Sequence, residues 1–162
     1  MPEERKPSIA FETTCDVAAS PDTVYRHLTD PYSYIGLSPL VVAVHDVRTG
    51  HDAEGRAVTD YVAVERFRLA GPLRWDNHIR VRMVATEPAG RLVSEVSSPG
   101  WVWLRAEVDL TAAAGGTRVR ERVTAGAPAP LRRFVASQAR EVASYRAAEL
   151  TRRMATTTGR GE

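Results

Sequence analysis

The order of secondary-structure patterns is the most restrictive feature of this chain. Nearly every residue from Pro39 to Gly126 belongs to a strand pattern or a turn, and the only long helical pattern, from Leu131 to about Met154, comes afterwards and stands alone. A single amphipathic helix laid across a strongly bent antiparallel sheet covers that sheet only in part. The order therefore predicts a curved sheet with a pocket left between its concave face and the helix.

Length and composition allow one globular domain. The 162 residues are 43% hydrophobic and 26% charged, enough for a core without a metal, and Cys15 has no second cysteine to pair with. The charged start from Met1 to Lys6 and the lack of a long apolar run predict a cytoplasmic protein without a signal peptide or membrane span. The net charge of +2 is too small to indicate a nucleic-acid partner.

The first forty residues predict one strand and two short helices. Residues 8–17 alternate between apolar and polar side chains, which is typical of a strand with one buried face. Ser20 before a proline predicts a helix start, because serine caps free amide groups and proline fits the first helical position. An aspartate-proline pair at 30–31 ends this helix, and residues 32–37 can form a second one.

Turn residues divide the following segment into six more strands. Short connections rich in glycine and proline favour hairpins. We therefore expect a seven-stranded antiparallel meander, which the first strand joins across the helices. The six strands are expected at residues 40–49, 56–69, 73–86, 91–98, 101–112 and 117–126.

Parity within the strands assigns side chains to the two faces of the sheet. In the last hairpin, Glu107 lies opposite Arg122 and Asp109 opposite Arg120 if the turn is at 114–115, so these charges face outward. The same parity predicts which residues of the two long central strands face the interior. This set includes Tyr61, Glu65, Phe67, Trp75 and Asn77.

The final helical pattern has an inward stripe that is partly polar. The stripe recurs at spacings of four and three, through Leu131, Val135, Gln138, Val142, Tyr145 and Glu149. We therefore expect Gln138, Val142 and Tyr145 to face the pocket. Residues 1–154 are predicted to form a single domain, and residues 155–162, rich in threonine and glycine, to form a disordered tail.

Three segments carry a resemblance to a known family: residues 19–35, residues 116–123, and Ala127-Pro128 ahead of the terminal helix. Together with the element order, they resemble the START-like (SRPBCC) superfamily in its bacterial polyketide cyclase/dehydrase and lipid-transport branch. The resemblance covers almost the whole chain. It implies an α+β helix-grip fold that holds apolar small molecules, such as lipids or polyketides, between the helix and the sheet.

Two glutamates are the main candidates for acid–base chemistry. Parity turns Glu65 and Glu121 toward the interior, where burial raises the pKa of a carboxyl group and suits it to general acid or base catalysis. The structural alternative is that an arginine neutralises each carboxylate, or that a bulge moves it outside. Tyr61 is the third candidate for proton transfer.

Other inward side chains fit a binding pocket. Polar groups that orient a ligand, or that complete an internal hydrogen-bond network instead, are expected from Tyr61, Asn77, Gln138 and Tyr145. Aromatic walls, or plain core packing, are expected from Tyr34, Phe67 and Trp75.

Two tryptophans do not fit the inward pattern. Parity places Trp101 and Trp103 on the outer face with Arg105. Either a bulge at residues 98–100 resets the alternation, or the two indoles are exposed near a pocket mouth or an interface.

No sequence motif indicates a metal or nucleotide site. The histidines lack the Cys/His spacing of a metal centre, and the sequence has no nucleophile-elbow, phosphate-loop or dinucleotide glycine motif. We therefore expect neither a metal nor a cofactor. The histidines are His27, His45, His51 and His78.

These observations leave three functional hypotheses. The first is binding of an apolar or aromatic small molecule, polyketide-like or lipid-like, between the C-terminal helix and the sheet, with polyketide cyclisation or dehydration as its catalytic form. The second is a carrier or sensor without turnover. The third is a protein-interaction module that uses Trp101 and Trp103. Ligand identity, turnover and the choice between monomer and homodimer stay open.

Overall fold

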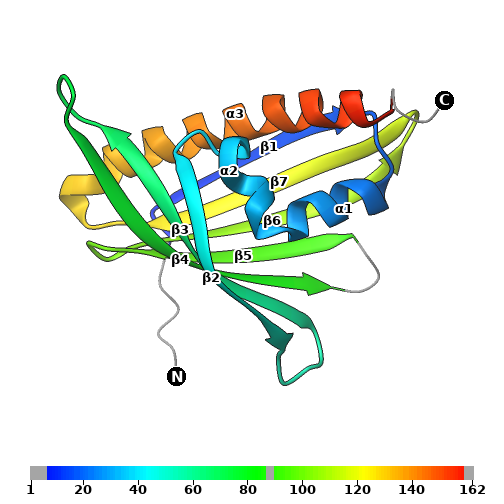
Figure 1. The fold of residues 1–162 in the computed structure, drawn as a ribbon, viewed down its shortest axis with the longest axis horizontal. Helices are drawn as coiled ribbons and strands as arrows, with labels where there is room; N and C mark the ends of the chain where they lie inside the picture. The colour runs from blue at the N-terminus through cyan, green and yellow to red at the C-terminus, as the bar shows by residue number, and fades with distance from the viewer. Residues whose placement is uncertain (1–6, 87–89, 159–162) are drawn as a thin grey trace.

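One curved sheet and one long helix organise the structure, a computed structural model that describes residues 7–86 and 90–158 (Figure 1). The seven predicted strands are present, and each boundary lies within two residues of its expected position. The strands are β1 (Ile9–Val17), β2 (Val41–His51), β3 (Ala57–Arg68), β4 (Arg74–Thr86), β5 (Arg91–Ser98), β6 (Val102–Ala113) and β7 (Gly116–Gly126).

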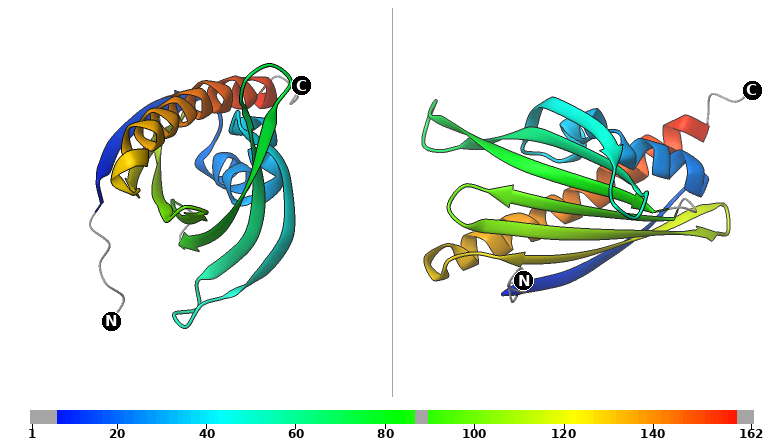
Figure 2. Two further views of the ribbon diagram at one scale, coloured as in Figure 1. Left: turned by 90° about the vertical axis from the view of Figure 1, so that its left-hand side faces the viewer. Right: turned by 90° about the horizontal axis from the view of Figure 1, so that it is seen from below.

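The sheet is an antiparallel meander, and the first strand is added beside the last one as an edge strand. Its order is β1-β7-β6-β5-β4-β3-β2, as the short connections predict. The register of the last hairpin is also confirmed, since Glu107 is paired with Arg122 and Asp109 with Arg120. Seen end-on, the sheet curls into an arc with the long helix across it (Figure 2).

Two short helices follow β1, as expected. In α1 (Pro21–Thr29), the amide of Thr23 donates to the Ser20 hydroxyl at 3.3 Å, which confirms the predicted cap. A 3₁₀ turn, η1 (Pro31–Ser33), leads into α2 (Tyr34–Leu37). Both helices lie on the concave side of the sheet, inside its arc (Figure 2).

The long helix α3 (Arg132–Thr158) follows a second 3₁₀ turn, η2 (Ala129–Leu131). It continues past residue 154, where the apolar pattern of the sequence stops. Residues 159–162 of the expected tail lie outside the described residues, as do the charged start and residues 88–89 of the expected turn before β5. No helix in the described ranges is long and apolar enough to cross a membrane.

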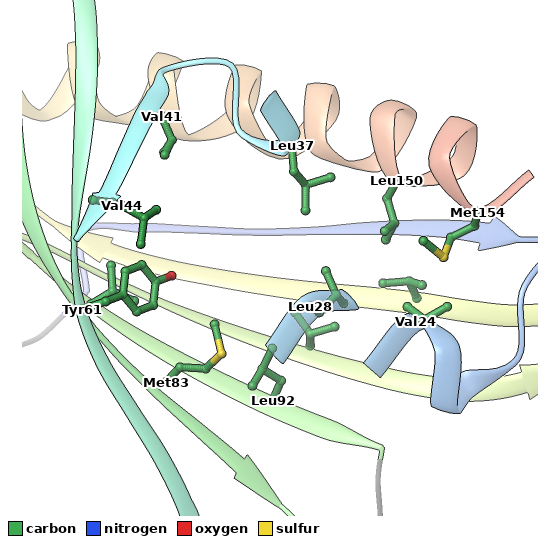
Figure 3. Packing of buried hydrophobic residues seen from close by; sticks show 14 of the residues in the cluster. Val24, Leu28, Leu37, Val41, Val44, Tyr61, Met83, Leu92, Leu150 and Met154 are labelled. Carbon is green, nitrogen blue, oxygen red and sulfur yellow. The ribbon is translucent and has the colours of Figure 1, made fainter. Parts of the chain in front are cut away.

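The apolar core occupies one end of the concave side. There Leu150 and Met154 of α3 pack with Val24 and Leu28 of α1 and with Leu37 of α2 (Figure 3). The side chains of Val24 and Leu37 are completely buried. Burial of a Leu or Val side chain contributes about 1.5–3 kcal/mol. This cluster therefore fastens the C-terminal half of α3 to the sheet.

Candidate ligand cavity

A cavity of about 300 Å³ lies on the concave side, between the N-terminal half of α3 and the sheet. Its walls are mostly apolar, with contributions from β3, β4, β6 and α3. Nine side chains that the sequence analysis assigned to the pocket line it. They are Tyr34, Tyr61, Glu65, Phe67, Trp75, Asn77, Glu121, Gln138 and Val142.

The expected inward position of Tyr145 is wrong. Its side chain is 44% exposed and does not line the cavity. The inward stripe of α3 is centred one residue further along, on Ala139, Ala143, Arg146 and Leu150. A rotation of one residue leaves Gln138 and Val142 on the edge of the stripe and turns Tyr145 away from the cavity.

Arg146 is the charged residue among the cavity-lining positions that the sequence analysis did not assign to the pocket. Its Nη1 donates to Glu121 Oε1 at 2.5 Å, and its Nη2 donates to Ser38 Oγ at 3.2 Å. The guanidinium also lies 5.9 Å from the ring centroid of Tyr34. A buried carboxylate such as that of Glu121 needs a cation beside it. This requirement could have pointed to an arginine on the facing helix.

Glu65 sits in a different environment from Glu121. No arginine ion pair holds it within the described residues, and its hydrogen-bond partner is the Asn77 side-chain amide, which donates at 3.4 Å. Burial raises the pKa of the Glu65 carboxyl group, although Asn77 and the charge of Arg146 act in the opposite direction. Of the two glutamates, Glu65 therefore has the environment of a general acid or base.

Two residues that line the cavity each have one buried polar atom without a hydrogen-bond partner in the described structure. Asn77 is only 5% exposed, and its amide nitrogen donates to Glu65 and to Ser98, but its Oδ1 accepts nothing. The second atom is Nε of Arg146, an unused donor. Buried polar groups are almost always hydrogen-bonded in proteins, so a free acceptor and a free donor on one cavity are unusual.

The two cavity tyrosines differ in how they are held. The Tyr34 hydroxyl donates to the Leu28 carbonyl at 2.9 Å, and burial raises the pKa of Tyr34 to about 12. Burial also raises the pKa of Tyr61, whose hydroxyl has no partner among the described residues. Tyr34 is therefore a fixed wall, whereas Tyr61 keeps a hydroxyl free for another group.

Aromatic side chains mark the open end of the cavity. Phe67 stacks on Trp75 with ring centroids 5.4 Å apart and contacts Phe134 of α3 at 6.1 Å. Trp75 and Phe134 line the cavity and are also exposed to solvent. The opening therefore lies between the β3–β4 hairpin and the start of α3.

The structure decides between the two alternatives for the tryptophans. No bulge interrupts the β5–β6 pairing, and only Trp103 of the two contributes to the cavity wall. Trp101 is 84% exposed, while Trp103 is half-buried and covers Gly126, where an added Cβ would lie 2.1 Å from the indole Nε1. Trp103 is thus a packed residue, and Trp101 alone projects.

Within the described residues, no three His, Cys, Asp or Glu side chains gather as a metal site would require. The candidate chemistry of the cavity therefore lies with Glu65, Asn77, Glu121 and Arg146, together with the hydroxyl of Tyr61.

Comparison with known proteins places the chain in a family. The family model described as polyketide cyclase / dehydrase and lipid transport matches residues 8–158. A search of the curated proteins found no match.

Several solved structures share the fold. A START superfamily protein from Mycobacterium smegmatis has a TM-score of 0.64 at 15% identity, over 91% of this chain and 98% of that one. The Zhui aromatase/cyclase from Streptomyces sp. R1128 has a TM-score of 0.67 at 16% identity, over 90% of this chain and 92% of that one. The di-domain ARO/CYC StfQ of the steffimycin biosynthetic pathway gives 0.68 at 14% identity, over 93% of this chain and 52% of that one. At these identities the likeness establishes the helix-grip fold.

Proposed function

Since this chain belongs to the polyketide cyclase/dehydrase and lipid transport family, we propose that its cavity binds a neutral, largely apolar small molecule of the polyketide type. One observation carries the proposal. An apolar cavity of about 300 Å³ is lined by Asn77 and Arg146, and each of these residues carries a buried polar atom without a partner, Oδ1 and Nε respectively. Few polar groups in an apolar cavity are what a small ligand needs for orientation.

The two free atoms define what the ligand should offer. Arg146 Nε–H needs an acceptor such as a ketone oxygen, and Asn77 Oδ1 needs a donor such as a hydroxyl group. Leaving such groups buried without partners costs about 1–3 kcal/mol each. The enol of a β-diketone, or a hydroxyl group next to an aromatic ketone, carries both functions at one end of an otherwise apolar molecule.

The charge balance of the cavity favours a neutral ligand. Arg146 already forms an ion pair with Glu121. A carboxylate ligand would have to compete with Glu121 for the guanidinium and would also enter a cavity that contains Glu65. We therefore expect anionic fatty acids to bind more weakly than neutral ketones of similar size.

In its catalytic form, the cavity would promote an intramolecular aldol condensation. The Glu65 carboxylate takes a proton from a methylene group between two ketones, and the resulting carbanion forms a bond to a carbonyl carbon further along the same chain. The alkoxide produced there takes the proton back, and a second proton transfer, in which Tyr61 can assist, releases water. Arg146 Nε–H stabilises the enolate oxygen. No cofactor enters this sequence.

A carrier without turnover is the second candidate. Glu121, one of the three residues proposed for proton transfer, is held by Arg146 at 2.5 Å and is not free to act as a base. A pocket that binds a ligand without catalysis needs only the polar groups that orient the ligand.

Calorimetry with a neutral probe tests the binding proposal. Benzoylacetone, whose enol can exchange its internal O–H···O hydrogen bond for one to Asn77 Oδ1 and one from Arg146 Nε, should bind more tightly than butyrophenone, which lacks the second oxygen. Asn77→Leu should remove this preference, whereas Arg80→Ala, on the outer face of the same strand, should keep it. Equal affinity of the wild type for the two probes would refute the polar subsite.

Turnover is tested separately with a linear poly-ketone, by following loss of water with mass spectrometry. Product formed by the wild type but not by Glu65→Gln, with binding retained in both, supports the catalytic form. Saturable binding without product in the wild type leaves the carrier function.

A further inference from the structure

The open end of the cavity is surrounded by exposed apolar side chains. They come from three parts of the sequence: the β3–β4 turn, the β5–β6 turn, and η2 with the start of α3, which lie at the same end of the molecule, on the left in Figure 1. We call this set the apolar rim; it consists of Leu69, Leu73, Trp101, Leu131 and Phe134.

Trp101 occupies its position against its backbone preference. Its φ is 63°, in the left-handed region that a bulky residue rarely adopts, and the preceding Gly100 also has a positive φ. The strained conformation holds the indole in solvent, where it gains little from packing within the domain. Backbone strain of this kind is typical of residues with a binding role.

Exposed arginines accompany the apolar rim. Within the described residues, none of them forms an ion pair, and Asp76, two residues after Arg74, is held by Arg66 at 2.8 Å. Away from the opening, Arg105, Arg118 and Arg120 each pair with an acidic side chain, whereas, in the described ranges, Arg48 and Arg80 do not. The unpaired set, the basic rim, consists of Arg68, Arg74, Arg132 and Arg133.

The two rims meet in one place. A shallow groove beside the opening is lined by both Trp101 and Arg132, together with Trp103. The Nε of Arg132 donates to the Ala127 carbonyl at 3.3 Å, and no acidic side chain pairs with its guanidinium within the described residues. An indole next to such a guanidinium offers one group to an apolar layer and one to a phosphate.

We propose that this end of the molecule docks on an anionic lipid bilayer. Single apolar side chains on separate turns can each enter a bilayer surface independently, whereas a protein partner would have to match all three turns at once. Tryptophan prefers the membrane interface, and arginines at the same level bind lipid phosphates. Docking in this orientation would let an apolar ligand pass between the bilayer and the cavity without crossing water.

Co-sedimentation of the full chain with vesicles tests the proposal. Binding is expected for vesicles of equal parts phosphatidylcholine and phosphatidylglycerol, with a blue shift of tryptophan fluorescence, and should weaken with added salt. Arg132→Ser with Arg133→Ser should weaken binding about thirtyfold, because each arginine contributes between about fivefold and sixfold near an anionic surface. Trp101→Asn should reduce the blue shift, and the part that remains comes from Trp75 and Trp103.

Matched variants keep the test specific. Arg48→Ser with Arg80→Ser removes the same charge away from the opening, and Tyr32→Ser removes an aromatic side chain that is exposed elsewhere; both should bind vesicles like the wild type. Asparagine tolerates the left-handed backbone, so Trp101→Asn should stay folded.

Two results would overturn the docking surface: no binding to the anionic vesicles, or an equal loss in the rim variants and their matched controls. Benzoylacetone binding by Trp101→Asn should be unchanged, so failure of the docking proposal is distinguishable from failure of the ligand proposal.

Discussion

The two ends of the concave side contrast in how the space between α3 and the sheet is used. Under the C-terminal half of α3, the side chains of α1 and α2 fill the space, and Leu150 and Met154 are buried among them (Figure 3). Under the N-terminal half, α3 presents small residues such as Ala139 and Ala143, and a cavity of about 300 Å³ remains. One end thus holds the helix in place, and the other is left free for a ligand.

The difference also extends to polar groups. The packed end contains almost only aliphatic side chains, whereas Glu65, Asn77, Glu121 and Arg146 all lie on the cavity. Buried polar groups that lack partners reduce stability. The domain therefore concentrates its unfavourable groups where a ligand can satisfy them and derives its stability from the opposite end.

Truncating one α3 side chain at each end of the concave side should give the largest difference in the free energy of unfolding. Leu150→Ala should lower the free energy of unfolding by about 3 kcal/mol, because it opens a cavity among buried neighbours. Val142→Ala, on the hollow side of the same helix, should cost less than about 1 kcal/mol. Urea denaturation measures both values, and equal costs would contradict the division into two ends.

Substitution of Arg146, the cation beside Glu121, should have the next largest effect on the free energy of unfolding. Arg146→Ala leaves the Glu121 carboxylate without its partner and should cost about 2 kcal/mol, less than in a dry core because 21% of the Arg146 side chain is exposed. Arg118→Ala, which breaks an exposed ion pair with Asp16, should cost at most about 0.5 kcal/mol. A comparable loss in the two variants, measured in urea, would mean that the cavity pair behaves like a surface pair.

Enlarging one side chain should have different effects at the two ends. Val24→Phe forces a ring into the packed cluster and should destabilise the protein by about 1.5 kcal/mol. Val142→Phe extends into free space and should be neutral within about 0.5 kcal/mol, while it abolishes binding of benzoylacetone. Thermal unfolding and calorimetry report the two properties. Unchanged ligand binding in Val142→Phe would show that the ligand lies elsewhere.

The smallest expected effect is a pH dependence confined to the hollow end. Burial raises the pKa of Glu65 above its ordinary value of 4.5, so the folded protein keeps this proton to a higher pH than the unfolded chain does. The stability associated with the neutral carboxyl group is complete below pH 4.5 and is lost as the pH rises through the folded pKa. Glu65→Gln should therefore gain stability relative to the wild type only at pH values above the folded pKa of Glu65.

Denaturation curves at several pH values measure this difference. Glu54→Gln, on the exposed β2–β3 turn, is the control for loss of a negative charge. If the wild type and Glu65→Gln differ by the same amount at every pH, the Glu65 carboxyl group titrates as it would in water.

Much of the fold could be predicted because its signals are local. Turn residues and strand parity set the strand boundaries, the Glu107–Arg122 register and the inward positions of Glu65 and Asn77. A two-residue period leaves only two possible faces, so parity errors are rare in regular strands. Helix faces are less well defined, which is why an error of one residue put Tyr145 in the pocket in place of Arg146.

By itself, the sequence determined the meander of seven strands, the capped α1 and the position of the long helix, because each depends on neighbouring residues and on backbone preference. Only the tertiary structure decided how α3 is rotated, that Glu121 pairs with Arg146 while Glu65 does not, and which end of the concave side stays hollow. These outcomes depend on contacts between separate elements, such as Arg146 with Glu121, 25 positions apart, and Arg146 Nη2 with Ser38 Oγ, 108 positions apart, and no local pattern encodes such contacts.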